Sequence, residues 1–66
     1  MDPTACYLEM FDAMNSGDYE TARERALALD DWLRRGGFAP PNYSAAEVKA
    51  FVGSVLRRTA YLDRQF

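Results

Sequence analysis

The sequence predicts an all-α protein, a compact three-helix bundle made from a single domain of 66 residues. Two observations carry this prediction. Clusters of Gly, Asn, Ser and Pro interrupt the chain at 15–18 and 36–43, and such clusters mark turns and loops. Between them, apolar residues recur at spacings of three and four, which is the period of an α-helix. We therefore expect helices over about residues 3–15, 19–35 and 45–63.

The first expected helix has a clear start and stop. Asp2 is a suitable N-cap, and Pro3 fits the first helical position because its missing N–H would have no helical partner there. Gly17 suits the left-handed position that follows a helix C-terminus. The apolar residues that share one face, and that we expect in the core, are Tyr7, Met10, Phe11 and Met14.

The second expected helix begins after Asp18, a good N-cap, and Glu20 adds negative charge to its first turn. It contains two acid–base pairs at i,i+4, which stabilise a helix: Asp30–Arg34 and Asp31–Arg35. Its apolar stripe is narrow, and its alanines would let a neighbouring helix approach closely. The stripe consists of Tyr19, Ala22, Ala26, Leu29 and Leu33.

The third expected helix has the strongest start signal, a capping box formed by Ser44 and Glu47. One wide face is apolar and should be buried: Val48, Phe51, Val52, Val55, Thr59 and Leu62. The preceding connection contains two prolines, which favour extended backbone, and it is long enough to cross the end of the bundle. We expect Phe38 and Tyr43 to cover that end.

The turn between the first two helices resembles part of a tetratricopeptide repeat. The matching residues, within 17–29, are Gly17-Asp18-Tyr19-Glu20-Thr21-Ala22 followed by Ala26 and Leu29. The match covers about half of one repeat; Cys6 and Met10 occupy positions where the repeat expects a large aromatic and a small residue, and the closing proline is absent. The resemblance implies a role in interaction, although one repeat cannot form the family's concave groove.

Composition excludes several classes of function. The formal net charge is −2, no stretch approaches the roughly 18 apolar residues of a membrane span, and the first residues lack the pattern of a signal peptide. We therefore expect no membrane association and a cytoplasmic location. With one cysteine, Cys6, no intrachain disulfide can form, and so small a core favours oligomerisation.

The residues that catalysis usually needs are missing. The sequence has no His, and Cys6 has no clustered base to activate it, so we expect a half-buried structural thiol. No spacing suits metal ligands, and Gly36-Gly37 ends a helix instead of cradling a phosphate. We therefore predict that the protein is not an enzyme and has no cofactor, metal or small-molecule ligand.

Nucleic-acid binding is the alternative function. The helix–short turn–helix around Gly17 is compatible with a helix-turn-helix regulator. However, the second helix begins with Asp18-Tyr19-Glu20, which would repel phosphate, and the net charge is negative. The basic cluster Arg57, Arg58 and Arg64 is better explained as a complement to the helix dipole.

The candidate interaction surface lies on the third helix, opposite its apolar face. Small residues and one arginine recur there at spacings of four and three: Ala46, Ala50, Gly53, Arg57 and Ala60. Such a stripe would let two helix backbones come close, which predicts a homodimer and a function in protein–protein interaction. The alternative is that these alanines are simply good helix formers on an exposed face.

Trp32 is the second candidate. It lies on one flank of the second helix's apolar stripe, with Leu27 on the other flank. In a three-helix bundle both flanks can be buried, which would make Trp32 a core residue. Otherwise it is a binding anchor, a role in which tryptophan is enriched.

Overall fold

A computed structural model of the chain describes residues 1–64 and confirms the predicted all-α, three-helix architecture. The helices are α1 (Pro3–Ser16), α2 (Tyr19–Arg34) and α3 (Ala45–Arg58), and a short 3₁₀ helix, η1 (Ala60–Arg64), follows them. Within residues 1–64 there is no strand. The predicted limits of the first two helices are correct to within one residue.

Side-chain caps begin all three helices, as predicted. Asp2 accepts hydrogen bonds from two backbone N–H groups in the first turn of α1, and Asp18 accepts one in α2 at 3.2 Å. The Ser44 hydroxyl accepts from the Glu47 N–H at 3.0 Å. Gly17 ends α1 in the left-handed region with φ 80°. Local hydrogen bonding therefore determines where each helix begins.

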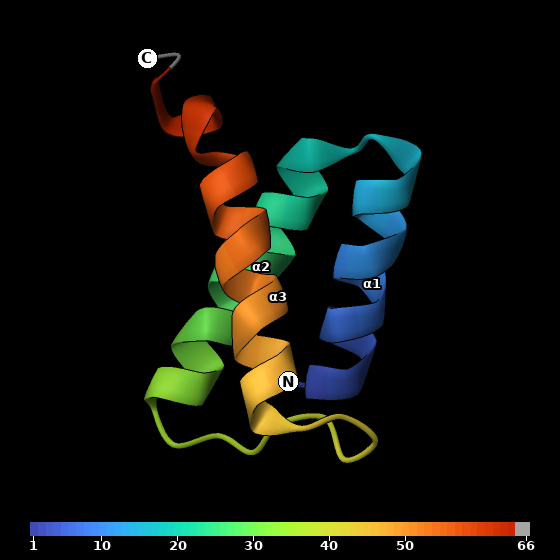
Figure 1. Cartoon of the computed structure of the whole chain (residues 1–66), viewed down its shortest axis with the longest axis vertical. Helices are drawn as coiled ribbons and strands as arrows, with labels where there is room; N and C mark the ends of the chain where they lie inside the picture. Colours follow the sequence, from blue (N-terminus) through green and yellow to red (C-terminus); the bar gives the residue numbers. More distant parts are fainter. Residues whose placement is uncertain (65–66) are drawn as a thin grey trace.

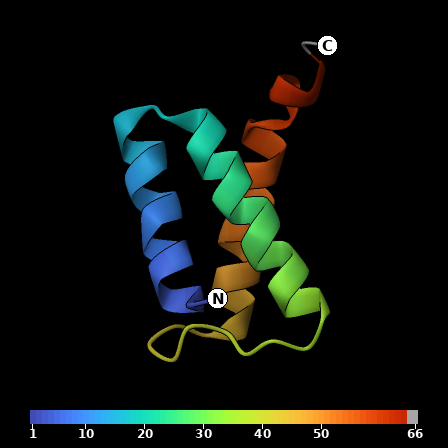
Figure 2. The ribbon, with the colours of Figure 1, turned by 180° about the vertical axis from the view of Figure 1, so that it is seen from behind.

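The helix α2 is the central element of the bundle. It runs antiparallel to both α1 and α3, and it crosses α3 obliquely (Figures 1 and 2). Two of its alanines, Ala22 and Ala26, are completely buried, so the neighbouring helices can pack close to it. The helices α1 and α3 contact each other through aromatic rings, with Tyr7 and Phe11 meeting Phe51.

The core draws on all three helices. Its buried members are Cys6, Tyr7, Met10, Ala13, Ala22, Ala26, Leu29, Val48, Val52 and Val55. Cys6 is more deeply buried than we expected from its place beside the main apolar face of α1. Phe11 and Tyr19, which belong to the predicted apolar faces, lie at the margins of the core and remain 36% and 42% exposed.

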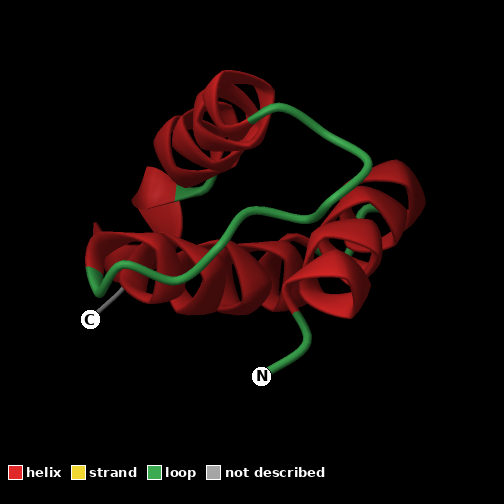
Figure 3. Ribbon diagram, turned by 90° about the horizontal axis from the view of Figure 1, so that it is seen from below, coloured by secondary structure: helices red, strands yellow, loops and turns green. Residues whose placement is uncertain are grey.

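The connection 35–44 crosses one end of the bundle (Figure 3), as predicted. Tyr43 contacts the core there, with its ring edge-on to Tyr7 at 4.8 Å. The expectation for Phe38 was wrong, because this side chain is 66% exposed. Pro40 is buried in the connection instead, and Phe38 packs edge-on against Trp32 at the bundle's surface.

The prediction that the third helix continues to residue 63 was also wrong. The α-helix ends at Arg58, Thr59 forms its C-cap, and the chain tightens into η1. The carbonyl oxygen of Leu56, which a longer helix would offer to the N–H of Ala60, accepts a hydrogen bond from Arg23 of α2. The Leu56 carbonyl therefore binds an arginine of α2 at the point where α3 ends.

Candidate functional site

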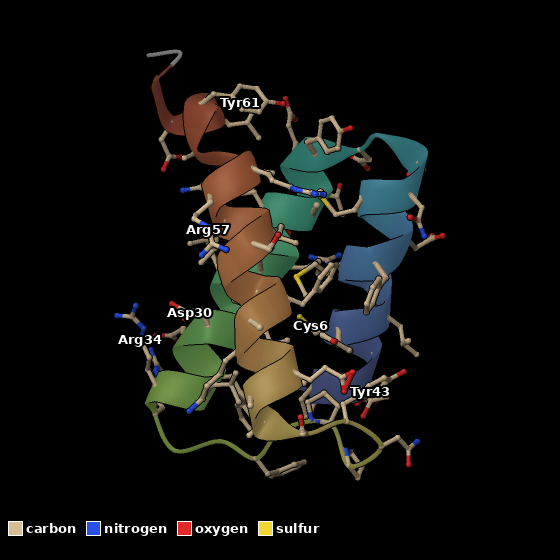
Figure 4. All side chains as sticks on the ribbon, viewed as in Figure 1. Cys6, Asp30, Arg34, Tyr43, Arg57 and Tyr61 are labelled. Atoms are coloured by element: carbon tan, nitrogen blue, oxygen red, sulfur yellow. The ribbon has the colours of Figure 1, made fainter. Side chains whose placement is uncertain are left out.

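Four of the five predicted interface residues lie on the outer face of α3, opposite the buried valines: Ala46, Ala50, Gly53 and Arg57. The fifth, Ala60, lies beyond the end of α3, in η1. Ala46, Ala50 and Arg57 are exposed, and Gly53 and Ala60 are half-buried. Figure 4 shows Arg57 on the side of α3 away from α1. Neither α1 nor α2 covers this face, so a second protein could reach it.

The fold itself explains three of the four glycines. Gly17 and Gly36 have φ values of 80° and 87°, which side chains disfavour. A Cβ on Gly37 would lie 2.4 Å from the Trp32 ring, so the ring requires a glycine there. Gly53 is different, because it is helical and a Cβ added there would meet only the Nη1 of Arg57, at 3.4 Å. No packing in the described part of the chain requires a glycine at 53.

Arg57 is the only large side chain on the outer face of α3. Its guanidinium lies close to Gly53, so the side chain folds back along the helix. Within the part of the chain that the structure describes, Arg57 makes no ion pair. Because an unpaired, exposed arginine can change rotamer at little cost, it could swing away and leave a surface of alanine and glycine.

Trp32 is held where α2 meets the following connection. Its indole Nε1–H donates to the carbonyl oxygen of Phe38 at 2.9 Å, and its ring packs partly against the core. The rings of Trp32 and Phe38 pack edge-to-face, with centroids 5.7 Å apart. Trp32 is half-buried, so it is positioned by the fold while part of its surface remains exposed.

Cys6 lies in the core between α1 and α2. Its thiol donates to the carbonyl oxygen of Arg25 at 3.3 Å. Burial raises the pKa of the Cys6 thiol, and the nearby Arg25 opposes this effect only in part. Because the reactive form of cysteine is the thiolate, this environment favours a structural thiol over a nucleophile.

All three arginines of α2, and Arg35 at its C-cap, form ion pairs. Arg34 binds Asp30 and Arg35 binds Asp31, each at 3.0 Å, as predicted from their spacing (Figure 4 shows Asp30 beside Arg34). The other two pair across helices. Arg25 bridges to Glu9 of α1 at 2.6 Å, and Arg23 binds Asp63 of η1. Each of these arginines therefore has a carboxylate beside it.

Sequence reasoning missed Arg23 altogether. Its side chain is only 14% exposed, and its partners lie 33 to 40 residues further along the chain. No spacing rule reaches so far. The one local signal is that Arg23 lies on the flank of the apolar stripe of α2, where a long side chain can reach a neighbouring helix.

The surface of the described residues has shallow hollows. One, of about 270 Å³, lies between α2 and α3 and is lined by Asp30, Leu33, Arg34, Lys49 and Val52. Among residues 1–64, no cluster of His, Cys, Asp and Glu could hold a metal ion. No helix in that range is long and apolar enough to cross a membrane.

Comparison with known proteins finds no match to a family, a curated protein or a solved structure.

Proposed function

We propose that this chain is a small protein–protein interaction module that self-associates through the outer face of α3. The observation that carries the proposal is Gly53. A glycine inside a helix costs about 1 kcal/mol relative to alanine. Among the described residues, nothing near Gly53 would be disturbed by an alanine, apart from the movable end of Arg57. Close approach of a second helix backbone supplies the missing reason for a glycine there.

The neighbours of Gly53 support the same proposal. Ala46 and Ala50 continue the small surface along the exposed side of α3, and Ala60 extends it past the end of the helix. A symmetric pair of α3 helices would place the same residues on both sides of the contact. Burying this face in a dimer would also enlarge a core that is small for an unstapled chain.

The test is sedimentation equilibrium of the wild-type chain at micromolar concentration. We expect a dimer, and we expect Ala50→Arg and Gly53→Arg to give monomers because a large charged side chain would separate the helices. Ala28→Arg is the matched control: it places the same residue on an exposed position of α2, and the dimer should persist. Circular dichroism verifies that all variants remain helical. A wild-type monomer, or equal disruption by Ala28→Arg, would refute the proposal.

Salt dependence separates this function from the nucleic-acid alternative. An interface of alanine and glycine should associate equally well at low and high salt. Nucleic-acid binding would weaken steeply as salt rises, because bound phosphates release their counterions. Tight, salt-sensitive binding of duplex DNA by the wild-type chain would favour the regulator instead.

A further inference from the structure

Arg23 joins α2 to the C-terminal part of the chain through all three of its guanidinium nitrogens. Nη1 donates to the Leu56 carbonyl oxygen and to the Thr59 hydroxyl, both at 3.1 Å. Nε and Nη2 bind the two carboxylate oxygens of Asp63 at 3.2 and 2.5 Å. This is the forked geometry that arginine forms with a carboxylate, extended to the end of a neighbouring helix.

These contacts lie where α3 stops. The last α-helical hydrogen bond runs from the Thr59 N–H to the Val55 carbonyl at 3.0 Å, and η1 begins with a tighter bond from Leu62 to Thr59. The next α-helical bond would join the N–H of Ala60 to Leu56. Within the described residues that bond is not made, and the Leu56 carbonyl accepts from Arg23.

The sequence of this segment nevertheless suits a continued α-helix. Residues 59–63 contain no Gly or Pro, and Thr59 and Leu62 extend the apolar face of α3. Tertiary contacts, and not the local sequence, therefore hold residues 60–64 in the tighter 3₁₀ form. Of the side chains that Arg23 binds, Thr59 is completely buried, whereas Asp63 is 67% exposed. The Asp63 carboxylate therefore faces solvent, where salt can screen its attraction to the largely buried Arg23.

We propose that Arg23 is a conformational latch with two states. In the latched state, Arg23 binds Asp63 and residues 60–64 form η1. In the released state, Asp63 leaves Arg23, the N–H of Ala60 bonds to Leu56, and α3 continues by about one turn, carrying Tyr61 and Leu62 to new positions. Ionic strength, or a partner that competes for Asp63 or Arg23, shifts the balance between the states.

The test is backbone NMR of the full chain at neutral pH. Asp63→Asn removes the charge from an exposed position and should leave the core intact. The Cα chemical shifts of residues 60–63 should then move towards α-helical values, and exchange of the Ala60 amide should slow about fivefold for the added hydrogen bond. Arg23→Met should shift the same residues further, and 1 M NaCl should shift the wild-type chain in the same direction.

Asp31→Asn is the matched control, because it removes another Asp–Arg pair, Asp31–Arg35, that shares no residue with the contacts of Arg23. It should leave the shifts of residues 60–63 unchanged. If Arg23→Met does not fold, Asp63→Asn and the salt titration decide the matter. Wild-type shifts in Asp63→Asn, random-coil shifts in place of helical ones, or an equal change in Asp31→Asn would each overturn the latch.

Discussion

The rings of Phe11 on α1 and Phe51 on α3 stack with centroids 4.0 Å apart and planes inclined by 14°. Tyr7 contributes its edge to both rings, at 5.1 Å from Phe11 and 5.8 Å from Phe51. Aromatic pairs contribute about 0.5–1.5 kcal/mol beyond the area that they bury. This cluster therefore joins two helices that both pack most closely on α2.

Removing one of these rings should loosen α3 from α1. We expect Phe51→Ala to lower the free energy of unfolding by about 2–3 kcal/mol, somewhat less than for a fully buried Phe, because Phe51 is half-buried. Phe38→Ala is the matched control and should cost less than about 1 kcal/mol, since its ring is mostly exposed. Chemical denaturation measures both values, and equal losses would contradict the assignment.

Alanine substitutions at Gly53 and at Gly37 should change the stability of the protein in opposite directions. Gly53→Ala should stabilise the monomer by about 1 kcal/mol through helix propensity, because only the end of Arg57 lies near the added methyl group. Gly37→Ala should destabilise it by about 1–3 kcal/mol, because the methyl group would collide with the Trp32 ring. Thermal unfolding at a concentration where the chain is monomeric compares the two. Stabilisation by Gly37→Ala would show that Trp32 moves freely.

The N-cap of α3 should contribute measurably to the free energy of unfolding. Ser44→Ala removes the hydroxyl that accepts from the Glu47 N–H, so we expect a loss of about 1 kcal/mol. Ser54→Ala, within the same helix, removes a hydroxyl that caps nothing and should change stability by less than about 0.5 kcal/mol. Urea titration of both variants checks the difference, and a larger loss in Ser54→Ala would be contrary to the prediction.

Stability should fall at alkaline pH. Burial raises the pKa of the Cys6 thiol above its ordinary 9.0 and, with smaller contributions from Glu47 and Tyr43, the pKa of the Tyr7 phenol above 10.0. The folded state therefore resists ionisation that the unfolded state permits. The free energy of unfolding should be independent of these groups below about pH 9 and should decline as pH rises towards their folded pKa values.

Substitution can identify the groups responsible for that decline. Tyr7→Phe should make the alkaline loss of stability shallower, because one of the two ionisations is removed. Tyr61→Phe removes a phenol that is half-exposed at the other end of the bundle and should leave the slope unchanged. Denaturant titrations between pH 8 and 11 provide the measurement. Equal effects of the two substitutions would argue against Tyr7.

Local sequence signals predicted most of the fold. The caps at Asp2, Asp18 and Ser44 and the stop at Gly17 act within a few residues of themselves, so they can be recognised without the tertiary structure. The same is true of the two i,i+4 ion pairs of α2. The places where prediction failed depend on contacts distant in sequence.

Arg23 and Phe38 illustrate those failures. Arg23 contacts the end of α3 although more than 30 residues separate them in the chain, and the helical pattern of residues 59–63 gave no sign of this contact. Phe38 is more hydrophobic than its neighbour Pro40, yet Pro40 is the buried residue, because the path of the connection decides which side chain turns inward. The interface on the outer face of α3 stays a prediction from sequence, to which the structure adds that no packing among the described residues requires a glycine at 53.

Because its indole bonds to the carbonyl oxygen of Phe38, Trp32 can serve as an intrinsic fluorescent probe. Trp32 is the only tryptophan in the sequence, and its indole bonds to the connection that leads into α3. Its fluorescence should therefore report whether that connection is seated on α2. Unfolding of the bundle can be followed in an unlabelled chain, and a partner that disturbs this end of the molecule should change the emission wavelength.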